Sequence, residues 1–165
     1  MDFAKIHKEL QNTKLRLKVK FHWDDDFINS AVDEYCRFLF LRKSFPEISI
    51  CPGFCVDEVW HDHILHTKNY TDFCNKMFGE YLHHIPKNLS ANDEFDPNPT
   101  IELYTQLYGY PPPTAYWFDK TTNKTSNNAN KDSNTSKNNI STNTKINTNN
   151  NTSFDCRCGC SLSKN

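Results

Sequence analysis

The sequence divides into a part that can fold and a part that cannot. Residues 120–153 are almost entirely Asn, Thr, Ser and Lys, with Ile140 and Ile146 as the only large apolar residues. Such a segment cannot bury enough apolar surface to offset the entropy of ordering, which costs roughly 1–2 kcal/mol per residue for the backbone alone. We therefore predict a single domain over residues 1–119, a disordered linker over 120–153 and a short cysteine-rich tail over 154–165.

Charge and hydropathy narrow the classes of partner. The full chain carries a net charge of −1, and the seven Lys/Arg against two Asp from Lys120 onward leave −6 on residues 1–119. An acidic domain is a poor candidate for nucleic-acid binding. The sequence shows no secretory apolar region and no membrane-length apolar run, so we expect an intracellular protein with no membrane partner. In a reducing compartment the seven cysteines are expected as thiols or metal ligands rather than as disulfides.

Apolar periodicity predicts a small, mainly α domain with long Pro-rich loops. Helical spacing of apolar residues occurs in four segments, namely 3–11, 25–42, 56–78 and 98–108. Two short segments are interpreted differently: Leu15–Val19 alternates like a brief strand, and Glu80–His84 is expected as a turn after Gly79. Residues 116–118 are aromatic and are expected to fold back onto the domain as a plug.

A dense histidine cluster is the chemical signal of this chain. Five of the seven histidines lie in residues 56–87, together with Cys74, and these are the side chains that ligate transition metals. On one continuous helix His61 and His63 point about 160° apart, and Cys74 lies about 16 Å from His63. A closed site would therefore combine ligands from 61–66 with one from 83–84, which must fold back after the glycine.

Two interpretations of this cluster stay open. In the first, Cys74 or a carboxylate such as Asp57 or Asp62 completes a metal site with the histidines. In the second, Trp60 and His63 belong to the core and the other histidines make ordinary hydrogen bonds, while Asp57 only complements the positive end of its helix.

The remaining cysteines fall into two groups. Cys51 and Cys55 have a spacing found at structural zinc sites, but the alternative is two small buried residues. Cys156, Cys158 and Cys160 alternate at the end of the chain, where they suit soft metals such as Cu(I) or Zn, or redox reactions. The alternative is a tail without a role.

The histidine window resembles a known family. The string Val-Asp-Glu-Val-Trp-His-x-His-Ile-Leu, continued by Tyr70, Phe73-Cys74, Phe78-Gly79 and Leu82-His83-His84, is similar to the glycine-rich domain-containing protein-like family. Flanking matches extend the resemblance over residues of about 20–118. It maps a shared pattern onto Asp57, Trp60, His61, His63, Tyr70, Cys74, Gly79 and His84.

The same resemblance qualifies some of these positions. His66 stands where bacterial members carry an acidic residue, and those members end in a Gly/Cys-rich tail that is here reduced to the last three cysteines. The family is largely without an assigned activity, so the resemblance implies a specific site without naming a reaction. The Asn- and Lys-rich composition is typical of an AT-rich genome such as that of a large DNA virus.

Three functions compete on this basis. The first is a metal-binding domain for zinc or another divalent transition metal, with ligands His61, His63, His84 and Cys74. Asp57 and Tyr70 would orient these ligands by hydrogen bonding to them. An open coordination position would permit hydrolysis, whereas a closed one would be structural. The second is a non-catalytic protein-interaction module, in which the histidines and Trp60 hold the helices together and the disordered tail tethers the domain to a partner. The third is an enzyme with Cys74 as nucleophile, although its place on an apolar helix face is typical of an inert thiol.

Overall fold

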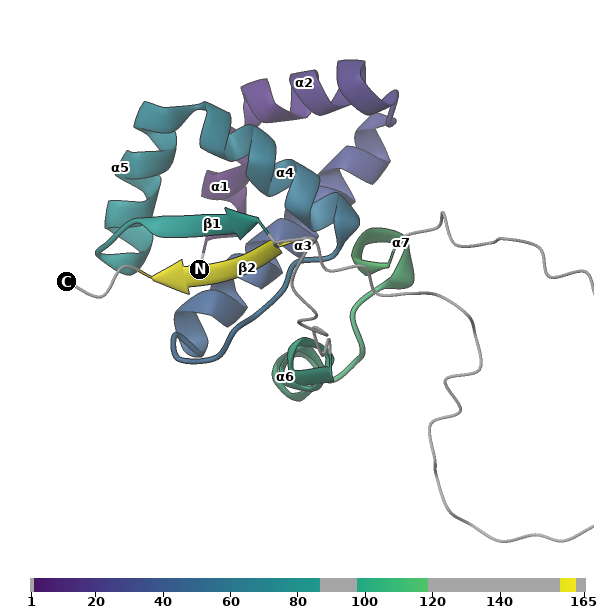
Figure 1. Cartoon of the computed structure of the whole chain (residues 1–165). Helices are drawn as coiled ribbons and strands as arrows, with labels where there is room; N and C mark the ends of the chain where they lie inside the picture. The colour runs from purple at the N-terminus through teal and green to yellow at the C-terminus, as the bar shows by residue number, and fades with distance from the viewer. Residues whose placement is uncertain (1, 87–97, 119–157, 163–165) are drawn as a thin grey trace, which may run out of the picture.

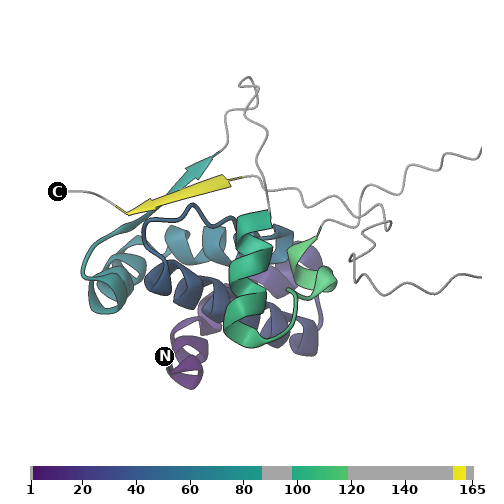
Figure 2. The same ribbon diagram turned by 90° about the horizontal axis from the view of Figure 1, so that it is seen from below.

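The computed structural model describes residues 2–86, 98–118 and 158–162. Over these residues the fold is mainly helical, which confirms the predicted class, and a two-stranded ribbon lies along one side of the helices (Figures 1 and 2). The elements in chain order are α1 (Phe3–Glu9), α2 (Gln11–Phe21), α3 (Asp25–Ser44), α4 (Phe54–Leu65), α5 (Thr67–Phe78), β1 (Leu82–Pro86), α6 (Asn98–Tyr108), α7 (Thr114–Trp117) and β2 (Cys158–Leu162). The linker expected over 120–153 and Cys156 lie outside the described residues.

Helix α3 forms the centre of the fold. The Asp24 carboxylate caps it by accepting a hydrogen bond from the Phe27 amide at 2.7 Å. Asp25 and Asp26 follow in the first turn, where negative charge complements the helix dipole. Its buried face packs most extensively against α4, which carries the histidine motif, so α3 is the support on which that motif is positioned.

The strand-like alternation at Leu15–Val19 does not correspond to a strand, because this segment lies inside helix α2. Leu17 is fully buried, whereas Leu15 and Val19 are 64% and 77% exposed. Thr13, which lies four residues before Leu17, is also buried, and this spacing of four is helical. Two exposed apolar residues around a buried one therefore imitated the alternation of a strand.

The single helix expected over 56–78 is instead two helices that meet at His66. Its backbone departs from helical geometry (φ −84°, ψ 58°), and its amide donates to the His63 carbonyl at 3.1 Å, which makes a tight turn. Helix α5 then runs to Gly79, which adopts a left-handed conformation (φ 81°) and ends it as expected. The turn expected at Glu80–His84 is also wrong, because Leu82 begins strand β1.

The aromatic plug forms around a buried carboxylate. Glu34 of α3 accepts hydrogen bonds at 2.8 Å from the Tyr104 hydroxyl and from the Trp117 indole, and both aromatic residues are fully buried. The Trp117 backbone packs directly on Gly53, where any Cβ would overlap it. These contacts fix α6 and α7 next to the start of α4.

Strands β1 and β2 join the histidine region to the C-terminal segment. They pair antiparallel, with His84 opposite Cys160 and Leu82 opposite Leu162.

Cys51, in the loop before α4, is disulfide-bonded, so the expectation that the cysteines avoid disulfides is wrong at this position. Cys36, Cys55 and Cys74 are in the thiol form. Among the described helices, none has the length and apolar character needed to cross a membrane.

Candidate functional site

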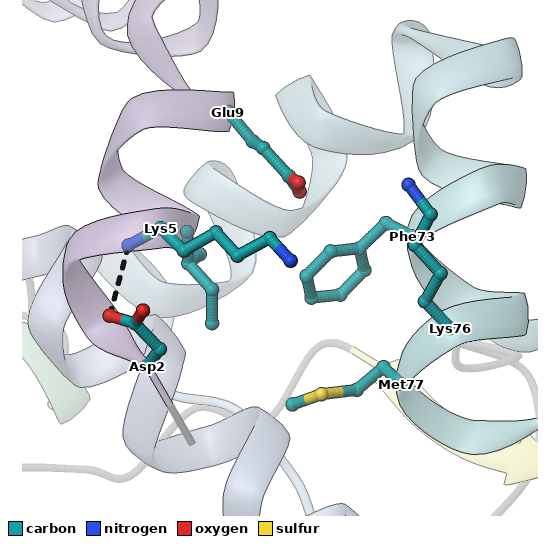
Figure 3. A pocket seen from close by; sticks show the side chains of 7 residues that line it. Asp2, Lys5, Glu9, Phe73, Lys76 and Met77 are labelled. Carbon is teal, nitrogen blue, oxygen red and sulfur yellow. Dashed lines mark hydrogen bonds between the residues drawn. The ribbon is translucent and has the colours of Figure 1, made fainter.

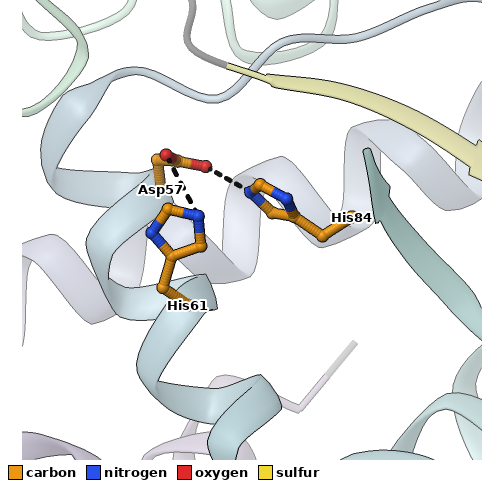
Figure 4. Close-up of side chains that lie close together, drawn as sticks. All are labelled: Asp57, His61 and His84. Carbon is orange, nitrogen blue, oxygen red and sulfur yellow. Dashed lines mark hydrogen bonds and ion pairs between the residues drawn. The ribbon is translucent and has the colours of Figure 1, made fainter. Parts of the chain in front are cut away.

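Asp57, His61 and His84 meet between helix α4 and strand β1 (Figure 4). Asp57 and His61 are four residues apart on α4, so they lie on the same helix face, one turn after the other. His84 reaches them from β1, after the chain has reversed direction at Gly79. The structure thus brings together two of the predicted ligands, His61 and His84, and the carboxylate of Asp57, which was expected to orient the ligands. We call these three residues the triad.

The Asp57 carboxylate lies between the two imidazoles. His84 Nε2 donates a hydrogen bond to Oδ1 of Asp57 at 2.9 Å, while His61 Nε2 lies 3.6 Å from Oδ2. The two imidazole ring centres are 4.4 Å apart. One donor atom from each of the three residues lies within 4.8 Å of the other two, so these atoms already converge on a common point.

Burial differs across the triad and gives it an inner and an outer side. The side chains of Asp57 and His84 are 7% and 9% exposed, whereas that of His61 is 43% exposed. His84 also packs on the indole of Trp60, with ring centres 4.5 Å apart. Asp57 lies in the first turn of α4, where the helix dipole favours its negative charge. The Asp57 carboxylate and the His84 imidazole are therefore fixed inside the protein, and the His61 imidazole lies at the solvent edge.

His63 lies in the core instead. It is 3% exposed, and a hydrogen bond of 3.0 Å joins its Nδ1 to the Tyr35 hydroxyl. The rings of Tyr70 and Phe73 contact it edge-on. Burial, and next the nearby His66, lower the pKa of His63 to about 4. The structure therefore does not bring this predicted ligand to the triad. His61 and His63 point in different directions around α4, as their spacing of two residues on a helix requires.

Cys74 and Tyr70 belong to a second buried group. The Trp60 indole donates to the Tyr70 hydroxyl at 2.8 Å, and this hydroxyl donates to the Leu82 carbonyl at 2.6 Å. Tyr70 thus fixes the start of β1, and through it His84, relative to α4. Cys74 is fully buried, and burial raises the pKa of its thiol. It is not in the triad, and a raised thiol pKa disfavours the thiolate that a cysteine nucleophile needs.

A second Asp–His pair lies one turn further along α4. Arg16 donates to Oδ1 of Asp62 at 2.6 Å, and His66 Nε2 lies 3.9 Å from Oδ2. Both Oδ2 of Asp62 and Nε2 of His66 are buried and have no hydrogen-bond partner among the described residues. Because the guanidinium of Arg16 already occupies this carboxylate, the pair is a poorer cation site than the triad.

Two hollows of the described surface lie away from the triad. One of about 210 Å³ separates α1 from α5, and Lys5, Glu9 and Lys76 line it around Phe73 (Figure 3). Another of about 230 Å³ is bordered by His63. Their linings mix both signs of charge and bring no triad residue into contact with the hollow, so neither extends the triad.

The comparisons with known proteins agree with the sequence pattern. The sequence profile of the UCP032817-like family matches residues 5–105. The chain belongs to the UCP032817-like family. The match runs from α1 into α6 and includes the whole triad, whereas β2 lies beyond it.

Among curated relatives of this UCP032817-like chain, two from Arabidopsis thaliana confirm the predicted resemblance. Glycine-rich domain-containing protein 2 is 40% identical over 68 residues, which is 38% of this chain and 9% of that protein. Glycine-rich domain-containing protein 1 is 39% identical over 64 residues, which is 36% of this chain and 8% of that protein. The chain therefore spans less than a tenth of each relative. No solved structure matches this UCP032817-like chain.

Proposed function

We propose that the triad of Asp57, His61 and His84 binds one divalent transition metal ion, with zinc as the first candidate. The convergence of one carboxylate and two imidazole donor atoms within 4.8 Å is the observation that carries this proposal. Two histidines and one carboxylate form a donor set used by catalytic zinc sites and by non-haem Fe(II) sites. The tail cysteines, whose side chains are not described, are not needed for this set.

The distances suit such an ion after small adjustments. Ligand bonds near 2.0–2.2 Å place the donor atoms of a tetrahedral zinc about 3.4 Å apart. The carboxylate–imidazole distances of 2.9 and 3.6 Å lie on either side of that value. Because His61 is the most exposed member, rotation of its side chain can complete the geometry without moving the buried pair.

The burial pattern favours a site that keeps one position for water or substrate. Three protein ligands leave the fourth tetrahedral position open, as in catalytic zinc sites. The solvent edge at His61 is the side from which a water molecule can reach that position. The chemistry such an ion supplies is Lewis acidity and a bound water of lowered pKa. We therefore propose hydrolytic chemistry of this class.

A titration with matched variants tests metal binding. The untagged full chain is titrated with Zn²⁺ against a competing chromophoric chelator, together with His61→Ala, His84→Ala and Asp57→Asn. Each alanine variant removes a donor and Asp57→Asn replaces the carboxylate by a neutral amide, so the expected affinity falls by at least about a hundredfold. His83→Ala is the control, because His83 is exposed and precedes His84 in the same strand. Equal affinity in all variants, or none in the unaltered chain, would contradict the proposal.

A second candidate function is a protein-interaction module in which the triad is structural. The observation that favours it is that Asp57 and Trp60 already hold His84 through a hydrogen bond and a ring contact. The triad would then brace β1 against α4, and the domain surface would bind a partner. This function predicts that a strong chelator leaves the melting temperature unchanged and that the chain retains a stable protein partner on pull-down. A lower melting temperature in chelator would count against it.

A further inference from the structure

His63 joins the core to a hollow at the surface. One ring nitrogen, Nδ1, is hydrogen-bonded to the Tyr35 hydroxyl at 3.0 Å. The other, Nε2, has no hydrogen-bond partner among the described residues and is not completely shielded from water. His63 is only 3% exposed and borders the hollow of about 230 Å³, so Nε2 is the polar atom that it presents there. Because buried polar groups are normally hydrogen-bonded, an unpaired nitrogen in the wall of a hollow points to a ligand.

This hollow adjoins the second one, of about 210 Å³, between α1 and α5. Glu9, Phe73 and Lys76 line both of them. Figure 3 shows Glu9 of α1 on one side of the gap and Phe73 and Lys76 of α5 on the other. Ile6 and Met77 add apolar surface to the second hollow only. A single small molecule can therefore place an apolar group there and its polar groups beside the buried imidazole.

The charged side chains shared by the two hollows carry both signs. Glu9 and Lys76 make no ion pair with another described residue. Asp72, which also borders the hollow with the imidazole, is paired with Lys68 at 2.8 Å, so Glu9 is the carboxylate that remains for a ligand. A carboxylate and an ammonium group at one site are complementary to a ligand that itself carries both charges.

We propose that the two hollows form one binding site for an α-amino acid with an apolar side chain. The ligand's ammonium group donates to Glu9, and its apolar side chain packs on Phe73 and Met77. Its carboxylate accepts hydrogen bonds from the Lys76 ammonium group and from His63 Nε2, since a tyrosine hydroxyl that donates to Nδ1 leaves the ring proton on Nε2. No triad residue lines either hollow, so binding here does not require the proposed metal.

Titration of the full chain with L-phenylalanine, followed by nuclear magnetic resonance, tests the site. EDTA is present throughout, so that no metal ion at the triad can hold the amino acid. Three matched probes each lack one feature: phenethylamine has no carboxylate, 3-phenylpropionate has no ammonium group, and glycine has no apolar side chain. We expect L-phenylalanine to bind at least about tenfold more tightly than each of the three, because each loses one set of contacts.

Two substitutions test the charged contacts. Glu9→Gln and Lys76→Gln each remove one charge-assisted hydrogen bond, so each should weaken the binding of L-phenylalanine at least about tenfold. Both side chains are exposed, so neither substitution should disturb the fold. Lys8→Gln is the control, because Lys8 is an exposed neighbour of Glu9 on α1 and lines neither hollow.

The ring signal of His63 places the ligand without any variant. Its Hε1 resonance can be assigned in the unaltered chain through the contacts of this ring with Tyr70 and Phe73. We expect this resonance to shift as L-phenylalanine is added, while that of the exposed His83 stays in place.

Specific outcomes overturn the inference. They are an unmoved His63 resonance at millimolar L-phenylalanine, a shift at His84 in its place, and equal or tighter binding of any probe that lacks one feature. Unchanged affinity in Glu9→Gln and Lys76→Gln would also overturn it. Since EDTA removes metal from every titration, a failure here is separate from a failure of zinc binding at the triad.

Discussion

Acid is the perturbation that most directly probes the buried histidine of the motif. His63 is buried among aromatic rings, and burial is the main reason why its pKa falls from 6.5 to about 4. Between these two values the unfolded chain binds a proton at this position and the folded chain does not, so stability is present above pH 6.5 and is lost as the pH falls. From pH 7 to pH 4 the free energy of unfolding should drop by about 3 kcal/mol from this histidine alone.

Urea unfolding followed by circular dichroism at pH 7 and pH 4 measures this drop. The chelator-treated chain is compared with His63→Gln, which keeps a polar group for the Tyr35 hydroxyl but cannot titrate. The variant should lose about 3 kcal/mol less on acidification than the unaltered chain, whereas His83→Gln, at an exposed position, should lose as much. Equal acid losses in His63→Gln and the unaltered chain would refute the argument, because His63 would then titrate alike in both states.

Two further substitutions test the packing that positions the triad. Tyr70→Phe leaves the buried Trp60 indole and the Leu82 carbonyl without their hydrogen bonds, so unfolding should become about 1–3 kcal/mol easier in urea titrations; a loss below the error of the titration would contradict this. Gly53→Ala places a Cβ on the Trp117 backbone, which cannot move as a side chain can. We expect a loss of several kcal/mol, of order 3 or more, measured by thermal melting, and an unchanged melting temperature would refute this contact.

Local sequence rules predict much of the helical fold. The cap at Asp24, the carboxylates of the first turn and the apolar period together define α3, and Gly79 ends α5 in the conformation that glycine favours. The same rules separate His61 from His63 around α4 and require His84 to return after the glycine. These features depend on residues within a few helical turns of one another, so they can be predicted from a single sequence.

The features that the sequence does not reveal depend on distant partners. Neither glycine nor proline marks the break at His66. Because of that break, the single-helix geometry assumed for Cys74 does not hold. Strand β1 exists because it pairs with residues near the end of the chain, and the disulfide of Cys51 is likewise absent from any local pattern. Asp57 is close to both imidazoles because β1 packs against α4. From the sequence alone, Asp57 was therefore only one of several candidates for a carboxylate ligand.

The metal content of the purified chain tests the central proposal most directly. The untagged full chain is expressed in zinc-supplemented medium and analysed by inductively coupled plasma mass spectrometry beside His84→Ala and His83→Ala. We predict close to one equivalent of a transition metal per unaltered chain and per His83→Ala chain, and far less in His84→Ala, because His84 is the nearly buried donor bonded to Asp57. A metal content near zero in the unaltered chain, or one that His84→Ala does not change, would contradict a metal site at Asp57, His61 and His84.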